Sequence, residues 1–264
     1  MNKAMNQAFR KRKITYTLAF LVVLALYLIS AYITEFDLQT GIKAFPEAAK
    51  WMSERLIPDA KAWERLPKIL DKLFETALLS VAVTVTAGIG AFMFSLLGSK
   101  TTGFRGIINQ LVRMTAAFFR NVPDVVWAMV LMFSFGQNIL TGYFALFFTT
   151  FGLLTRSFIE TIDEVSASCV EALNATGANF IQIVFQGIIP SAMTGIITWI
   201  LYMIETNIRS STLIGILTAT GIGYLFDMYY KRIEFGSAGL VVMAIVVLVI
   251  VIETISIQIR KVIK

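Results

Sequence analysis

The stretch VEALNATGANFIQIVFQGIIP, Val170–Pro190, joins an acidic helical segment to an apolar segment that is able to cross a membrane. Small and apolar residues recur at helical spacing up to Gly177, while Glu164 and Glu171 mark another face. Gly177 is expected to end the first helix, and Asn179 is expected to cap the next one. The pattern predicts a short helix, a turn and a second helix that continues into a membrane span.

The composition of the whole chain agrees with a membrane protein. Of its 264 residues, 57% are hydrophobic and 15% are charged, whereas ordinary soluble domains carry about 25% charged residues. The mean hydropathy is +0.74. A chain of this length has room for about six spans of about 20 residues each. No separate soluble domain fits.

Six mainly apolar runs supply these spans, so the predicted fold is an all-α membrane protein with about six transmembrane helices. The runs are 14–34, 76–99, 110–135, 139–158, 178–207 and 236–259. A further run, Ser210–Phe226, is short and rich in glycine, serine and threonine. We interpret it as a re-entrant or surface-lying segment, since a seventh crossing would put the basic C-terminus outside.

The distribution of basic residues predicts the orientation. Lysines and arginines cluster before the first run, between residues 100 and 113, and at the C-terminus, which is the positive-inside pattern and argues against a nucleic-acid partner. The predicted organisation is a cytoplasmic basic N-terminus at 1–13, a retained first transmembrane anchor at 14–34, an extracytoplasmic loop and interfacial segment at 35–75, a transmembrane core at 76–259 with a cytoplasmic loop at 160–190, and a cytoplasmic tail at 260–264.

The residue types exclude several classes of site. There is no histidine, and Cys169 is the only cysteine, so intrachain disulfides and the commonest zinc ligand sets are excluded. Cys169 lacks a histidine that would activate it as a nucleophile, and a small residue on a helix is the favoured interpretation. The sequence also lacks the GxxxxGK[ST] nucleotide loop. We therefore expect no catalytic residues, no metal and no cofactor in this chain.

The segment EALNATG with its distant proline resembles the EAA loop of the permease subunits of bacterial ABC importers. The pattern of that loop is Glu-Ala-Ala, three residues, Gly, nine residues and Ile-x-Leu-Pro. The residues that match in type and spacing are Glu171, Ala172, Gly177 and Pro190. The residues that depart from the pattern are Leu173 in place of alanine, Gly187 in place of isoleucine and Ile189 in place of leucine.

Two further segments indicate which branch of the superfamily the chain resembles. FRNVPDVVWAMVL at 119–131 and ETNIRSSTLIG at 205–215 look like the phosphonate permease branch of that superfamily, and the similarity runs from about residue 76 to the C-terminus. The resemblance implies import of phosphonate or a related small phosphorus oxyanion. The alternatives are an importer for phosphate, phosphite or an amino acid and, in another class, an ion-driven secondary carrier, for which no convincing inverted repeat is present.

The resemblance also implies a fold and partners. It implies the type I ABC importer permease fold, in which the EAA loop is a cytoplasmic coupling helix that docks on a separate ATP-hydrolysing subunit. The alternative for this loop is a solvated connection between spans. The implied partners are a second copy of the chain, ATP-binding-cassette ATPase subunits, an extracytoplasmic substrate-binding protein and membrane lipid. The implied location is the bacterial inner membrane, with both termini in the cytoplasm.

Two arginines are candidates for a path taken by an anion. Arg120, beside Asn121, lies within the third apolar run, where an unpaired charge is costly. Its guanidinium would suit an anion, with Pro123 bending the helix nearby. Pairing with Asp124 at i,i+4 or reaching toward the cytoplasm is the equally weighted alternative.

Arg209 is the second candidate. It precedes the hydroxyl groups of Ser210 and Ser211 at the start of the glycine-containing run, where irregular backbone at membrane depth would line a cavity. The alternative is that Arg209 only neutralises Glu205, one turn earlier. We favour the translocation path for Arg209.

Overall fold

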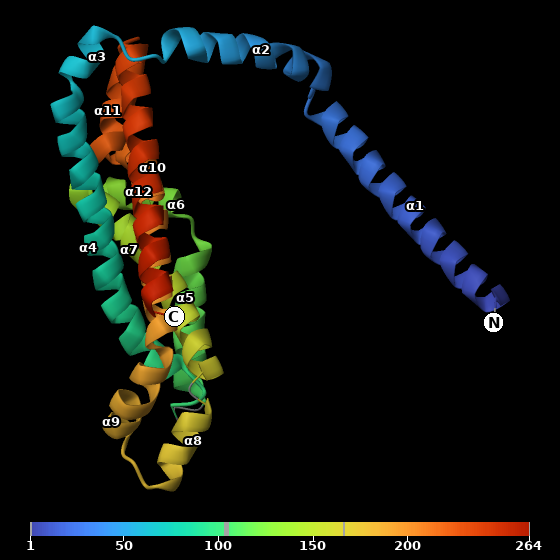
Figure 1. The fold of residues 1–264 in the computed structure, drawn as a ribbon, viewed down its shortest axis with the longest axis vertical. Helices are drawn as coiled ribbons and strands as arrows, with labels where there is room; N and C mark the ends of the chain where they lie inside the picture. Colours follow the sequence, from blue (N-terminus) through green and yellow to red (C-terminus); the bar gives the residue numbers. More distant parts are fainter. Residues whose placement is uncertain (1, 103–105, 166, 264) are drawn as a thin grey trace. The chain divides into compact units, whose positions relative to one another are not determined.

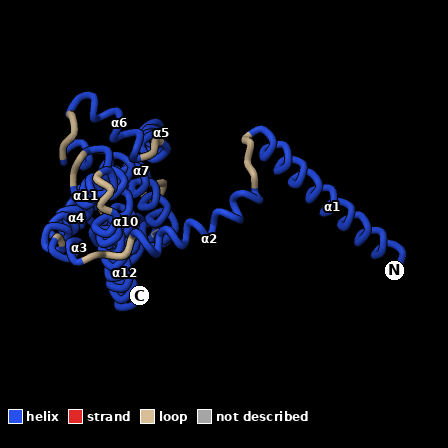
Figure 2. Tube along the Cα trace, turned by 90° about the horizontal axis from the view of Figure 1, so that it is seen from above, coloured by secondary structure: helices blue, strands red, loops and turns tan. Residues whose placement is uncertain are grey.

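The computed structural model describes residues 2–102, 106–165 and 167–263, which form helices joined by short connections, with no strand among them (Figures 1 and 2). The all-α prediction is confirmed. Residues 1, 103–105, 166 and 264, which belong to the predicted N-terminal segment, core, loop and tail, lie outside the described residues. The chain divides into two compact units, Met1–Glu54 and Arg55–Lys264.

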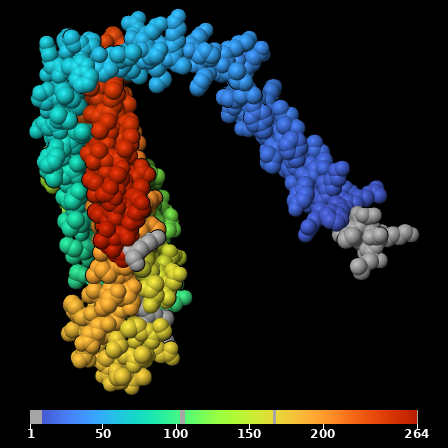
Figure 3. Space-filling view, in the orientation of Figure 1, coloured from blue at the N-terminus to red at the C-terminus, as the bar shows by residue number. Residues whose placement is uncertain are grey.

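The first unit consists of two helices. Helix α1, Asn2–Ile33, contains an apolar segment at Phe9–Ile33 that is long enough to span a membrane, and none of its most apolar window is buried. Helix α2, Leu38–Arg55, is amphipathic and has no buried residue. Figure 3 shows α1 in dark blue and α2 in lighter blue.

The second unit is a helical bundle built around α7. In chain order its helices are α3 (Ala60–Glu64), α4 (Leu66–Gly98), α5 (Ile107–Asn121), α6 (Asp124–Phe135), α7 (Ile139–Val165), α8 (Ala167–Ala175), α9 (Phe180–Gln182), the π-helical segment η1 (Ile183–Ile188), α10 (Ile189–Thr218), α11 (Gly221–Lys231) and α12 (Phe235–Ile263). Helix α7 contacts α4, α5, α6 and α10. Its side chains Leu154 and Phe158 are fully buried in the main apolar core.

The number of spans agrees with the six that the sequence predicts. Among the described residues, five helical stretches are long and apolar enough to cross a membrane, and the α5–α6 pair makes a sixth if it is one broken span. That pair is bent by 88° at the break, so the run 110–135 folds as two helices, and the bend that we expected near Pro123 lies between them. Pro123 has no N–H to donate and pushes Val122 into an extended conformation, with φ −91° and ψ 119°.

The backbone over 210–226 is helical on both sides of one short turn, and not irregular as we expected; its re-entrant or surface-lying position stays a prediction. Helix α10 continues to Thr218, Ala219 takes a left-handed conformation with φ 56°, and α11 begins at Gly221. The glycines allow two helices to approach closely, since an added Cβ on Gly223 would lie 2.0 Å from the Thr212 carbonyl oxygen. Glycine in this segment therefore reflects close packing of α10 on α11 and not loose backbone.

The bundle has two distinct ends. Helices α8 and α9 lie at one end, and α3 and α11 lie toward the other (Figure 1). At the α3 end, the Arg65 guanidinium forms an ion pair with Glu234, with a distance of 2.9 Å from Nη2 to Oε1. Hydrogen bonding to Arg65 lowers the pKa of Glu234 to about 2. Glu234 therefore stays ionised, and ties α3 to the start of α12, throughout the physiological pH range.

Candidate functional site

The segment that resembles the EAA loop folds as a helical hairpin, which we call the EAA hairpin (residues 167–190). Helix α8 ends at Ala175, and Gly177 in the turn that follows has a φ of +80°. The Gly177 N–H donates to the Asn174 carbonyl, and the Ala178 N–H donates to the Leu173 carbonyl, which together form a Schellman motif. Both hydrogen bonds of a capping box join Asn179 to Gln182. The predicted helix end and N-cap are confirmed.

The hairpin presents its acidic face to the outside. Glu171 and Ala172 are exposed, whereas Val170 is 3% exposed and belongs to the main apolar core. The exposed face is therefore free to meet another protein, while the opposite face fixes α8 to the bundle.

Two of the three departures of this sequence from the family pattern, Leu173 and Gly187, lie against each other. An added Cβ on Gly187 would lie 2.8 Å from Leu173 Cδ1 and 3.6 Å from Cys169 Sγ. The large side chain at 173, where the pattern has alanine, occupies the space left at 187, where the pattern has isoleucine. The hairpin thus keeps its packing with the sizes exchanged between its two arms.

A π-helical segment connects the hairpin to α10. In η1 the Ile189 N–H donates to the carbonyl of Val184, five residues earlier. Pro190 follows in the first turn of α10, where the missing N–H costs little. Inserted π turns are frequent at functional sites, and they interrupt the regular ladder of a helix. This interruption lies at the junction between the hairpin and a membrane span.

A cluster of polar contacts fixes α7 next to the hairpin, at Asp163. The Asp163 carboxylate accepts from Ser99 Oγ at 2.6 Å, from the Lys100 N–H at 2.8 Å and from Arg113 Nη2 at 2.9 Å. Arg113 Nε also donates to the Gly98 carbonyl at 3.0 Å. Asp163 therefore joins the end of α4, the start of the α4–α5 connection and α5 to the last turn of α7. Sequence reasoning did not single out this residue.

Arg120 and Asn121 lie at the end of α5, beside the break before α6, and both are exposed. The break removes the helical register that would place Arg120 beside Asp124. Among the described residues no ion pair joins the two, and Asp124 Oδ1 accepts from the Val125 N–H at 2.9 Å. Pairing with Asp124 therefore does not explain Arg120.

Arg209 belongs to a charged group of three residues. Its Nη1 lies 2.8 Å from Glu205 Oε1, and Arg260 Nη2 of α12 lies 3.9 Å from Glu205 Oε2. The side chain of Arg209 is 49% exposed, while that of Glu205 is 12% exposed. Two guanidinium groups face one carboxylate, which leaves the group with one excess positive charge. Sequence reasoning assigned Arg260 only to the basic tail.

The two serines after Arg209 are placed differently. Ser210 is half-buried, whereas Ser211 is 5% exposed. The hydroxyl of Ser211 donates to the Ile208 carbonyl and lies 3.2 Å from the hydroxyl of Ser80 on α4. Arg120 and Arg209 share no contact that would bring them into one site within a single chain.

A buried polar ladder runs from this region across the bundle. The Asn207 amide donates to Thr84 Oγ1 of α4 at 2.9 Å and to Thr150 Oγ1 of α7 at 3.0 Å. Asn207 is 3% exposed. Interhelical hydrogen bonds of this kind fix helix register where apolar contacts alone are poorly directional. The ladder therefore holds α10, which carries Arg209, in register with α4 and α7.

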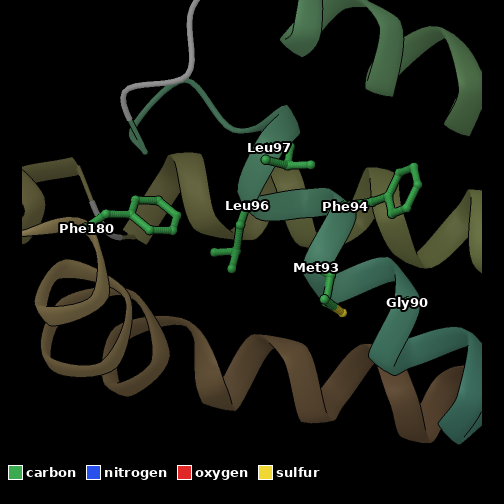
Figure 4. A pocket seen from close by; sticks show the side chains of 6 residues that line it. All are labelled: Gly90, Met93, Phe94, Leu96, Leu97 and Phe180. Atoms are coloured by element: carbon green, nitrogen blue, oxygen red, sulfur yellow. The ribbon is translucent and has the colours of Figure 1, made fainter.

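An apolar hollow of about 330 Å³ lies between α4 and α9 (Figure 4). The residues that line it are Gly90, Met93, Phe94, Leu96, Leu97 and Phe180. None of them offers a charge or a side-chain hydrogen-bond donor, so this hollow does not suit an anion.

Residues 90–263 match the family of binding-protein-dependent transport system inner membrane components. The chain is 26% identical over 188 residues to the phosphate-import permease protein PhnE of Mycolicibacterium smegmatis, a match that covers 71% of this chain and 35% of that protein. The chain thus spans about a third of that relative. It is 28% identical to a putative phosphite transport system permease protein of Stutzerimonas stutzeri, over 90% of this chain and 84% of the relative.

A third relative is a putative cryptic phosphonate transport system permease protein of Escherichia coli K12, 32% identical over 44% of this chain and 96% of the relative. Among solved structures, an inward-facing methionine ABC transporter matches with a TM-score of 0.59 at 20% identity, over 75% of this chain and 98% of the matched chain. At that identity the structural match supports the fold, which is that of an ABC importer permease.

Proposed function

Because the chain belongs to the family of binding-protein-dependent transport system inner membrane components, we propose that it forms the membrane pore of an ATP-driven importer for phosphonate or a related small phosphorus oxyanion. The observation that carries the substrate class is that the names of three relatives refer to phosphate, phosphite and phosphonate. The chain is a permease subunit, and ATP hydrolysis belongs to a separate ATPase.

Family membership implies an ATPase, a substrate-binding protein and a dimeric permease as the working assembly. We propose that two copies of this chain associate with two ATP-binding-cassette ATPase subunits, and that an extracytoplasmic binding protein delivers the anion. The protein is a multi-pass membrane protein. Both termini face the cytoplasm in this proposal, since basic residues at 10–13 and at 260–261 flank the first and last spans.

The EAA hairpin is the proposed contact with the ATPase. Glu171 and Ala172 lie on its exposed face, Gly177 forms its turn, and Pro190 follows the π-helical junction that leads into α10. Movement of a docked ATPase would then be passed through this junction to a membrane span.

We expect Glu171→Lys to lower ATP-driven uptake about tenfold, because reversing a charge at a docking contact costs on the order of 1.4 kcal/mol or more. The measurement is uptake into vesicles that contain the reconstituted complex. Glu164→Lys is the matched control, because Glu164 is also exposed but lies outside the motif. Normal uptake by a fully assembled Glu171→Lys complex would exclude Glu171 from the coupling contact.

Arg120, Asn121, Arg209, Ser210 and Ser211 are the proposed anion path. The support is the half-exposed guanidinium of Arg209 in a group with one excess positive charge, and the exposed position of Arg120 at the α5–α6 break. Ser211, whose hydroxyl is already bonded, would contribute by holding α10 against α4. A guanidinium suits two oxygens on one phosphorus atom.

We expect Arg209→Gln to reduce uptake about tenfold with assembly intact, and Arg209→Lys to retain only part of the activity, because a point charge replaces a planar fork. The decisive variant is Glu205→Gln combined with Arg209→Gln. If Arg209 only neutralises Glu205, the double variant regains uptake, and Arg209 then has no place in the path. If Arg209 meets the anion, the double variant stays as impaired as the single one.

A further inference from the structure

We propose that α2 lies along the membrane surface, with one apolar stripe in the lipid at the boundary between headgroups and acyl chains and with its charged stripe in water. This inference concerns the first compact unit and does not depend on the transported substrate.

The apolar stripe follows the period of an α-helix. Leu38, Ile42, Phe45, Ala49 and Met52 recur every three or four residues, so at about 100° per residue they lie within about 80° of one another around the helix. Ile42 is 65% exposed and Phe45 is 75% exposed. Within the first unit, α2 has no buried residue. A continuous apolar stripe about 20 Å long therefore runs along this helix.

The opposite side of the same helix is charged. Lys43, Glu47, Lys50 and Glu54 occupy a sector of about 60° that faces away from the apolar stripe. The signs alternate along the helix, and Lys50 Nζ lies 3.9 Å from Glu54 Oε1. A helix with one narrow apolar stripe and a charged opposite side fits an interface between lipid and water, whereas a helix that crosses the bilayer is apolar all round.

The end of α1 fixes how far the start of α2 lies from the bilayer. Helix α1 ends at Ile33 after a segment that is apolar on all sides, and α2 begins at Leu38. Five Cα-to-Cα steps reach at most about 18 Å, so α2 begins close to the edge of the bilayer. The reach is shorter still, because the Phe36 N–H donates back to the Ala31 carbonyl at 2.9 Å.

The start of α2 is also fixed locally. Asp37 Oδ1 accepts from the Gln39 N–H at 2.9 Å, and the other Asp37 oxygen accepts from the Thr40 hydroxyl. These hydrogen bonds, that from Thr40 first, hold the pKa of Asp37 below its ordinary value. A charged cap at the end of a membrane span places the first turn of α2 in the headgroup region, so its apolar stripe continues the lipid-facing surface of α1.

Collision accessibility of spin labels tests this placement. In a Cys169→Ser background, single cysteines replace Ile42 and Phe45 on the apolar stripe and the neighbouring Lys43 and Glu47 on the charged stripe. Each labelled, full-length protein is reconstituted without partners into phosphatidylcholine–phosphatidylglycerol vesicles. Relaxation is measured with oxygen, which concentrates in lipid, and with a water-soluble nickel chelate.

We expect the ratio of oxygen to nickel accessibility to be about threefold or more higher at 42 and 45 than at 43 and 47, because the two stripes meet different solvents. Equal nickel accessibility at all four positions would show α2 in water and overturn the proposal. Shielding of 42 and 45 from both reagents would also overturn it, because the stripe would then be covered by protein, such as a second copy of the chain.

Discussion

Gly187→Ile should abolish most ATP-driven uptake. A side chain at 187 would begin 2.8 Å from Leu173 Cδ1, so isoleucine must push α8 away from η1 or force Leu173 out of its position. Overpacking of this kind costs about 1–3 kcal/mol, and displacement of the exposed acidic face would impair docking further. We expect uptake to fall tenfold or more, since about 1.4 kcal/mol corresponds to a factor of ten.

A second change, Leu173→Ala, should restore uptake to the Gly187→Ile variant. Leu173→Ala combined with Gly187→Ile gives the sizes that the family pattern has at these two positions, with the small residue on α8 and the large one on η1. We expect the double variant to recover uptake to within about twofold of the unmodified protein, because volume-conserving exchanges are tolerated best. Leu173→Ala alone should show an intermediate loss from the space it leaves.

The test is a double-mutant cycle. We measure uptake and basal ATPase activity at matched expression for the two single variants and the double variant. A double variant no better than Gly187→Ile would contradict the exchange of sizes across the EAA hairpin.

Asp163→Ala should have the second large effect. The carboxylate accepts three hydrogen bonds, from Ser99, Lys100 and Arg113, and is partly buried. Its loss leaves Arg113 without its acidic partner and removes the link between the α4–α5 connection and the last turn of α7. Hydrogen bonds to a charged group contribute about 1.5–3 kcal/mol, so we expect the folded permease to be destabilised by about 2 kcal/mol.

The measurement is the temperature at which half of the purified permease loses its folded state, which should fall by several degrees. Glu160→Ala is the control, since Glu160 is 57% exposed and pairs with Arg156 one turn earlier, and surface pairs of this kind contribute little. Equal shifts for the two variants would show that Asp163 is an ordinary surface acid.

The parts of the molecule that the sequence predicted well depend on local interactions. Gly177 and Asn179 were correctly identified as a helix end and an N-cap because both roles need only the residue and its near neighbours. Five of the six apolar runs likewise correspond to helices long and apolar enough to cross a membrane, and the sixth corresponds to the bent α5–α6 pair, because hydropathy over about 20 residues is a local property.

The parts that failed depend on distant neighbours. Gly223 suggested loose backbone, but its role is to admit the Thr212 carbonyl from α10. Arg260 was grouped with a basic tail, and its proximity to Glu205 arises only when α12 packs on α10. Asp163 meets Ser99 and Arg113 across 64 and 50 residues. No local pattern in one sequence encodes such pairings.

We propose that this permease imports a phosphorus oxyanion with energy from a partner ATPase. The most direct measurement is the ATPase activity of the complete complex in vesicles, with its binding protein loaded in turn with methylphosphonate, phosphite, phosphate or methionine, and with tracer uptake followed in parallel. We expect at least one phosphorus oxyanion to raise both ATP hydrolysis and uptake, and methionine to raise neither. Stimulation by methionine with no response to any of the three oxyanions would contradict this proposal.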